Sequence, residues 1–179
     1  MAEAKQSYIQ EQMLSLIDPK LVDQWGDPNK HPETQLSQEQ VDQLLAAGRE
    51  MFISHLTRDG FPMVTVHVYC FIDGQLWSTT VKGRVKAAAY QRDPRCALCI
   101  SSSGLKLPFG GALTIKARAT VIEERALVER VCREHARRYY SGERAQELFF
   151  GTLFTPNRVA LRFDIDKIIS WANIGVRRD

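Results

Sequence analysis

Short strand-forming segments joined by tight turns dominate the middle of this sequence. Two Asp-Gly pairs, Asp59 with Gly60 and Asp73 with Gly74, separate segments rich in β-branched and aromatic residues. An Asp-Gly pair supplies the positive φ that a tight hairpin turn requires. We therefore expect antiparallel strands, joined as hairpins, over residues 51–56, 63–72 and 75–80.

The segment 113–122 carries the clearest strand pattern, because apolar and polar side chains alternate along it. Such alternation is typical of a strand with one face on the core and the other in water. Ser37 and Gln40 form a capping-box pattern that predicts the start of a helix, which Gly48 would end. Many antiparallel strands with helices at their sides predict a mainly β fold, a small barrel of six to seven strands. The remaining strands are expected over residues 96–101, 158–165 and 167–171, and the remaining helices over residues 84–91 and 124–140.

The chain length of 179 residues fits one domain over residues 36–179, preceded by an N-terminal extension over residues 1–35. A formal net charge of +3 is too small to indicate a nucleic-acid partner. No apolar run approaches the ~18 residues that a membrane span needs. The first residues also lack the apolar core of a signal peptide. These features predict a cytoplasmic protein that contacts neither nucleic acid nor membrane.

Cys96 and Cys99 have the CxxC spacing of redox and zinc sites. They lie inside a strand-like segment, in which residues three apart face opposite sides. That geometry does not chelate one metal ion, and no second pair of Cys or His has a zinc-finger spacing. We therefore interpret them as structural cysteines and expect no metal site.

A candidate phosphate site follows the third predicted strand. Thr79 and Thr80 end that strand, and Gly83, Arg84 and Lys86 lead into a short helix. A helix N-terminus presents unpaired N–H groups and partial positive charge, to which Arg84 would add a two-pronged donor and Lys86 a point charge. Two residues apart on a helix point about 200° away from each other, so both cations converge only if Arg84 precedes the regular helix. The alternative interpretation is an ordinary solvated basic turn.

No catalytic residue stands out. The four histidines share no motif with a serine or cysteine nucleophile, and His67 is the best candidate among them because of its place on the second predicted strand. The glycine-rich loop over residues 102–111 fits either a partial lid over a site or a plain connection between strands. The four histidines are His31, His55, His67 and His135.

The order of these segments closely resembles the pyridoxamine 5'-phosphate oxidase-like family, whose members are flavin-binding split β-barrels. The resemblance covers residues 45–171 and depends on the order and spacing of several short motifs rather than on one of them. These motifs are Phe61-Pro62-Met63-Val64-Thr65-Val66, Thr79-Thr80, Arg84-Val85-Lys86, Arg92-Asp93-Pro94-Arg95, Thr155-Pro156-Asn157-Arg158-Val159 and Asp166-Lys167-Ile168-Ile169-Ser170-Trp171.

The resemblance implies a homodimeric split barrel of the FMN-binding type, with two cofactor sites at the subunit interface. It implies that Thr79, Thr80, Arg84 and Lys86 hold the cofactor phosphate. The second strand, here with Met63, Val64 and Thr65, would run beside the flavin ring, and Trp171 would approach the site of the other subunit.

The resemblance also has departures. Many members have an Arg-Asn pair after the lysine, where this chain has Ala87 and Ala88. The C-terminal Arg-x-His pattern of a true pyridoxamine phosphate oxidase is missing, since Arg177 and Arg178 are followed by no histidine. We therefore do not expect vitamin B6 oxidation.

The resulting expectation is a flavin-dependent oxidoreductase that transfers hydride to or from a small organic substrate. FMN is the expected cofactor and the deazaflavin coenzyme F-420 the alternative, because both carry a tricyclic ring and a phosphate. Flavin chemistry needs no catalytic triad, since the cofactor carries the hydride and the protein orients it. A non-catalytic protein that stores or carries flavin is the alternative function.

Overall fold

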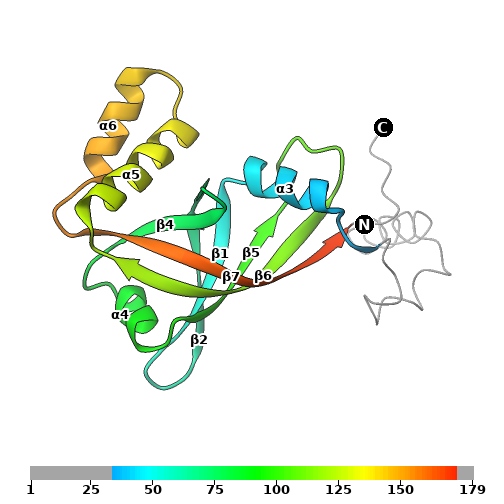
Figure 1. The fold of residues 1–179 in the computed structure, drawn as a ribbon, viewed down its shortest axis with the longest axis horizontal. Helices are drawn as coiled ribbons and strands as arrows, with labels where there is room; N and C mark the ends of the chain where they lie inside the picture. The colour runs from blue at the N-terminus through cyan, green and yellow to red at the C-terminus, as the bar shows by residue number, and fades with distance from the viewer. Residues whose placement is uncertain (1–33, 173–179) are drawn as a thin grey trace, which may run out of the picture.

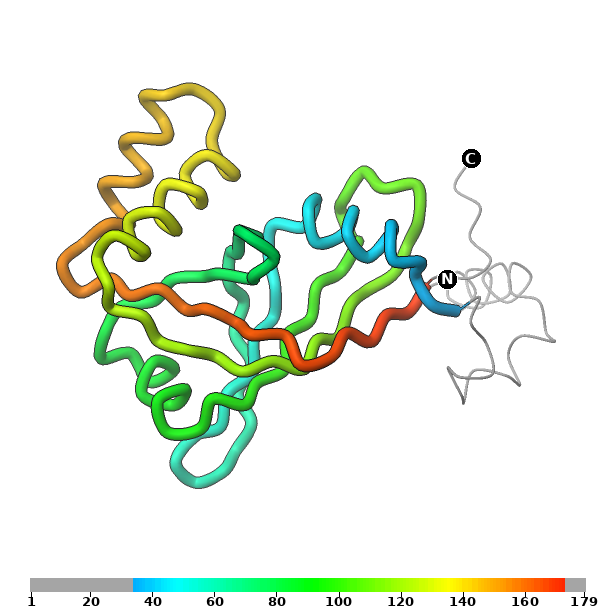
Figure 2. The backbone as a smooth tube through the Cα atoms, viewed as in Figure 1, coloured from blue at the N-terminus to red at the C-terminus, as the bar shows by residue number. Residues whose placement is uncertain are grey.

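The computed structural model describes residues 34–172, which form a curled sheet with helices around it (Figures 1 and 2). No helix in this part of the chain is long and apolar enough to cross a membrane. The helices are α3 (Gln38–Ala47), α4 (Val85–Arg92), α5 (Arg125–Tyr139) and α6 (Glu143–Leu153). The strands are β1 (Glu50–Leu56), β2 (Pro62–Val68), β3 (Cys70–Ile72), β4 (Gln75–Val81), β5 (Arg95–Ser101), β6 (Gly111–Ile122) and β7 (Arg158–Ala172).

All seven strands belong to one sheet in the order β2-β1-β5-β6-β7-β4-β3. Every pairing in it is antiparallel. The long strands β6 and β7 run diagonally across the molecule and curl the sheet into a half-barrel, while the α5–α6 hairpin projects from one end (Figure 1). The prediction of a mainly β split barrel with flanking helices is confirmed.

Two apolar clusters hold these layers together. The larger one fills the inner side of the sheet and includes Leu44 of α3, Tyr90 of α4 and Phe163 of β7. The smaller one lies between α5 and the strands β3, β4 and β7, and includes Cys132 and Trp77. Helix α5 is joined to the end of α3, because the Arg138 guanidinium donates to the carbonyl oxygens of Ala46 and Gly48.

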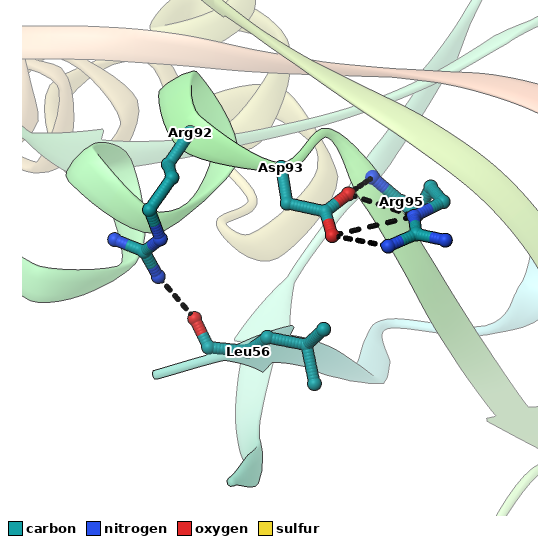
Figure 3. A network of polar contacts seen from close by, with 4 residues as sticks. All are labelled: Leu56, Arg92, Asp93 and Arg95. Atoms are coloured by element: carbon teal, nitrogen blue, oxygen red, sulfur yellow. Dashed lines mark hydrogen bonds and ion pairs between the residues drawn. The ribbon is translucent and has the colours of Figure 1, made fainter. Parts of the chain in front are cut away.

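Helix α4 is anchored against the open edge of β1, where β1 and β5 separate. The Tyr90 hydroxyl donates to the Ser54 carbonyl oxygen at 3.0 Å. Arg92 reaches from the last turn of α4 to the Leu56 carbonyl oxygen at 2.5 Å (Figure 3). Just beyond it, Asp93 accepts hydrogen bonds from the backbone and guanidinium of Arg95 (Figure 3). The Arg-Asp-Pro-Arg motif therefore ends the helix and fixes its position on the sheet.

The structure differs from the prediction in three places. The predicted strand 63–72 is two strands, because the chain changes its partner at Tyr69: β2 pairs with β1 as far as Val68, and β3 pairs with β4 from Cys70. The predicted strands 158–165 and 167–171 are one strand, β7, with an irregularity opposite Lys116 and Ala117. Helix α6 was not predicted; none of its residues is fully buried.

The loop between β5 and β6 is a hairpin connection packed on the barrel. Leu105, Leu107 and Phe109 lie against the larger apolar cluster. The Ser102 side chain accepts the Gly111 N–H at 2.8 Å and closes the base of the loop. These contacts favour the plain connection over the partial lid.

The outer face of the sheet is apolar along one continuous row of paired residues. Phe52 of β1 lies between Val66 of β2 and Cys99 of β5. The row continues through Thr114 to Ile169 of β7. Phe52 and Val66 are 48% and 52% exposed. This strip of side chains, named here the outer-face row, is mostly apolar, with Thr114 as its polar member, and Phe52, Val66 and Ile169 in it are exposed to solvent.

Candidate functional site

The start of helix α4 forms the centre of the predicted phosphate site. Gly83 has a φ of 89°, which only glycine adopts readily, and it turns the chain after β4. Arg84 is the N-cap residue with extended backbone, so it precedes the regular helix. The first helical hydrogen bond runs from the Ala87 N–H to the Arg84 carbonyl, which leaves the N–H groups of Val85 and Lys86 outside the helical ladder. Arg84 therefore precedes the regular helix, which is the condition under which its side chain and that of Lys86 can point to the same side.

Lys86 points from α4 toward strand β2. Its ammonium group lies 3.5 Å from the Thr65 hydroxyl and forms a hydrogen bond with Nε2 of His67. Burial, and next to it the nearby Arg84 guanidinium, lowers the pKa of Lys86. Arg84 therefore lies near enough for its charge to act on the Lys86 ammonium group.

His67 connects this lysine to strand β4. Its Nδ1 lies 3.0 Å from the Ser78 hydroxyl oxygen, and that hydroxyl donates to the Val68 carbonyl oxygen at 2.8 Å. Burial, followed by the charges of Lys86 and His55, lowers the pKa of His67 to about 4. A pKa this low leaves the imidazole uncharged at neutral pH.

The site carries positive charge without a compensating carboxylate. Within residues 34–172, neither the side chain of Arg84 nor that of Lys86 forms a hydrogen bond or ion pair with Asp or Glu. The neighbouring Lys82 differs, since its ammonium group pairs with Glu123 at 2.6 Å. Two uncompensated cations beside free backbone N–H groups make this region a suitable place for an anion.

The two threonines of the predicted site lie on opposite faces of β4. Thr80 shares the inner face with Ser78, while Thr79 faces the same way as Trp77, toward the α5 layer. Both residues are buried. A single group can therefore meet the hydroxyl of only one of them from one side of the strand. Ser78, which the sequence analysis did not select, contributes its hydroxyl on the inner face.

The residues predicted to border the ring are also divided between two faces. Met63 and Thr65 lie on the same face of β2 as His67. Val64 and Trp171 lie on the opposite, outer face and are 59% and 48% exposed. One chain thus brings together Thr65, Lys86 and the start of α4, but not Val64 and Trp171.

Two alternatives to this site carry less weight. A cavity of about 500 Å³ lies between α5 and α6, but its lining contains none of the predicted site residues. Cys96 and Cys99 lie on opposite faces of β5, as expected, and residues 34–172 contain no group of three or more His, Cys, Asp or Glu arranged to hold a metal ion.

A curled antiparallel sheet with a cationic helix start against its edge strand defines the molecule as a split β-barrel. The sequence profile described as "Pyridoxamine 5'-phosphate oxidase" matches residues 37–172. The chain belongs to the pyridoxamine 5'-phosphate oxidase family in this broad sense, which confirms the resemblance found in the sequence.

Solved structures share the fold at low sequence identity. A conserved hypothetical protein from Mycobacterium tuberculosis has a TM-score of 0.68 and 22% identity, over 78% of this chain and 86% of that chain. A FAD-binding protein from Mesorhizobium loti has a TM-score of 0.57 and 16% identity, over 78% and 96%. An F420 reductase has a TM-score of 0.53 and 13% identity, over 72% and 94%. No curated protein matches the sequence significantly.

Proposed function

We propose that this protein is a flavin-dependent oxidoreductase that binds FMN, or alternatively coenzyme F-420, and transfers hydride to or from a small organic substrate. The observation that carries the proposal is the position of Arg84 at the N-cap of α4 and of Lys86 in its first turn, neither of which pairs with a carboxylate within residues 34–172. It is supported by membership in a family whose fold is shared by a FAD-binding protein and an F420 reductase.

The residues present fit the phosphate of such a cofactor. The Arg84 guanidinium and the backbone N–H groups of Val85 and Lys86 supply donors that have no helical acceptor. The Lys86 ammonium and the Thr80 side of β4 complete the donor set in this proposal. The cofactor supplies the hydride transfer when it is bound, while the chain holds the phosphate and orients the ring along β2.

The proposal includes a homodimer, because the side chains that family resemblance assigns to the ring lie on two faces of the sheet in one chain. Val64 and Trp171, which family resemblance assigns to the ring and to the second subunit, lie on the outer face with the outer-face row. A second copy packed on this apolar surface would bring its own Trp171 toward the cofactor and exclude water from the ring.

Vitamin B6 is not the proposed substrate. No Arg-x-His pattern follows strand β7 in the given sequence, and Arg177 and Arg178, which occupy that region, lie outside the described residues. We propose a different small organic acceptor or donor, taken up beside the ring.

The test begins with the small molecule that accompanies the purified protein. Its visible spectrum and mass distinguish FMN from the deazaflavin, and stopped-flow reduction and reoxidation of the loaded protein then measure turnover. Loading followed by turnover with an electron acceptor supports the enzyme. Loading without turnover would support the flavin-storage alternative, and failure to bind either cofactor would refute both.

A further inference from the structure

The contacts of His67 determine which of its two ring nitrogens carries the proton. The Ser78 hydroxyl uses its single proton to donate to the Val68 carbonyl oxygen at 2.8 Å. Its oxygen must therefore accept the hydrogen bond that it makes with Nδ1 of His67 at 3.0 Å. Nδ1 carries the proton, and Nε2 is left with a lone pair directed at the ammonium group of Lys86.

This arrangement holds a lysine without reducing its charge. A carboxylate partner would cancel the positive field of Lys86, whereas a neutral imidazole accepts one of its protons in a hydrogen bond and leaves the charge intact. A lysine side chain loses considerable conformational freedom when it is fixed in one direction. In this molecule the hydrogen bonds to His67 and Thr65 fix that direction before any ligand arrives.

We propose that His67 is a positioning residue, which accepts a hydrogen bond from Lys86 at Nε2 and holds the ammonium group over β2 for the phosphate monoester of the cofactor. This inference rests on the proposed function, and it adds the element that aims the lysine. It also gives His67 no part in proton transfer, because its Nδ1 proton is held by Ser78 and its Nε2 lone pair by Lys86.

The surroundings of His67 favour the neutral ring that this role needs. The groups that act on it electrostatically are Lys86 of α4 and His55 of β1. His67 in turn acts on His135 of α5. Arg84 acts on Lys86 from the other side. No carboxylate in the described part of the chain is hydrogen-bonded to the ring. The imidazole is therefore surrounded by groups that are positive or become positive on protonation, which opposes its own protonation.

The first experiment is a double-mutant cycle, with FMN affinity measured by fluorescence quenching at pH 7.5. His67→Phe keeps the ring shape but removes the acceptor, and we expect it to weaken FMN binding about tenfold. His67→Gln keeps an oxygen acceptor within reach of Lys86 and should bind within about threefold of the wild type. In a Lys86→Met background, His67→Phe should have almost no further effect, because the lysine that it positions is gone.

Two results of this cycle would overturn the proposal. One is an equal loss for His67→Phe with and without Lys86, which would mean that the histidine acts only on the fold. The other is a loss in His67→Gln as large as that in His67→Phe. Thermal unfolding of each variant identifies any that has lost its fold. If His67→Phe is one of these, Ser78→Ala takes its place in the same cycle, because it removes the partner of Nδ1 and keeps the imidazole ring.

A second measurement does not depend on the cofactor. The ¹⁵N chemical shifts of the imidazole nitrogens in the protein without FMN report which nitrogen of His67 carries the proton. We expect the proton on Nδ1 at pH 7.5, and a proton on Nε2 would overturn the proposal whether or not FMN binds. If the wild type binds neither FMN nor coenzyme F-420, the proposed function fails together with the phosphate role, while the ¹⁵N result still decides how His67 and Lys86 are joined.

Discussion

Arg84 and Lys86 act on the same region, but different features hold them. The position of Arg84 follows from the backbone, since Gly83 turns the chain and leaves Arg84 as the N-cap of α4. The position of Lys86 follows from side chains on another strand, His67 and Thr65. The first arrangement is local in sequence and the second is not, so substitutions should separate them.

Removing either cation should weaken cofactor binding and leave the fold intact. Hydrogen bonds to charged groups contribute about 1.5–3 kcal/mol, so we expect Arg84→Ala and Lys86→Ala each to raise the dissociation constant of FMN roughly tenfold to a hundredfold. The matched control is Lys82→Ala, a nearby cation that already pairs with Glu123. Isothermal titration calorimetry measures all three, and unchanged affinity in both site variants would remove the phosphate assignment.

Buried histidines should make stability depend on pH. His135 is fully buried with no hydrogen-bond partner for either ring nitrogen, and burial, followed by the charges of Arg138, Arg158 and His67, lowers its pKa to about 4. The unfolded chain titrates near 6.5, so between pH 6.5 and 4 it binds more protons than the folded chain. The free energy of unfolding therefore falls as the pH falls through this range, by about 1.4 kcal/mol per pH unit for each such histidine.

His135→Leu tests this dependence. The substitution removes an unpartnered polar ring and should raise the free energy of unfolding, more at pH 5 than at pH 7.5. Urea denaturation at several pH values should show a slope smaller by about 1.4 kcal/mol per pH unit than that of the wild type. A wild-type slope retained in the variant would mean that His135 does not titrate as its burial indicates.

The sequence predicted the local part of the candidate site better than the distant part. Gly83, Arg84 and Lys86 are neighbours in the chain, so helix geometry alone could state the condition that Arg84 must precede the regular helix, although the predicted helix began at Arg84 itself. His67 and Ser78 meet only because β2 and β4 face each other across the sheet. No spacing in the sequence predicts the contact between His67 and Ser78, although His67 was the preferred candidate among the histidines for a functional role. The same limit applies to Thr79 and Thr80. Strand alternation predicts that their side chains lie on opposite faces of β4, but it does not predict which of the two faces the inside of the barrel.

At the scale of elements, α4 is the part on which the site depends. Tyr90 and Arg92 attach its C-terminal half to β1, which leaves its N-terminus facing β2 and β4. Gly83 sets the angle at which the chain enters it. The helix is short, so a change at either end should alter where Arg84 points.

Gly83→Ala should weaken FMN binding beyond its effect on stability. An added Cβ meets no atom within 4 Å, so the cost comes from the positive φ and should be about 1–2 kcal/mol. Gly142→Ala is the matched control, because Gly142 also has a φ of 89°, has open space around it and precedes a helix, α6, outside the site. Both variants should lose similar stability in thermal unfolding, and only Gly83→Ala should lose FMN affinity. Equal affinities would show that the angle of α4 does not govern the site.

The elements that sequence analysis missed lack strong local signals. Helix α6 begins after Gly142 without a side-chain cap and contains Gly151, so the sequence of this segment is typical of a loop. It forms because Phe150 and Leu153 pack on α5 within the smaller apolar cluster. Strand β7 was divided at Asp166, where the ladder with β6 skips a residue without ending. Whether α6 forms and whether β7 is continuous depend on tertiary packing and on the strand that pairs with β7.

At the scale of the whole molecule, the sheet has two different faces. The inner face is buried by α3, α4 and the larger apolar cluster. The outer face exposes Phe52, Val66 and Ile169 along one paired row, with Trp171 beside it. Scattered apolar residues on a surface need no explanation, whereas a contiguous row across five strands is typical of an interface. The proposed homodimer would use this face, which carries Val64 and Trp171, two of the residues that the family resemblance assigns to the cofactor ring.

A charge in the middle of the outer-face row should separate the subunits. Because Phe52 is half exposed in one chain, Phe52→Glu should cost little stability in a monomer but should bury an unpaired carboxylate in a dimer. Light scattering should give about twice 20.4 kDa for the wild type and about 20.4 kDa for the variant. FMN affinity should fall with the loss of the dimer, because the second subunit's part of the site is lost. Leu148→Glu, at a more exposed apolar residue on α6, should stay dimeric and bind FMN normally. A Phe52→Glu variant that remains dimeric would exclude this face as the interface, and a clean monomer with full FMN affinity would show that one chain forms the whole site.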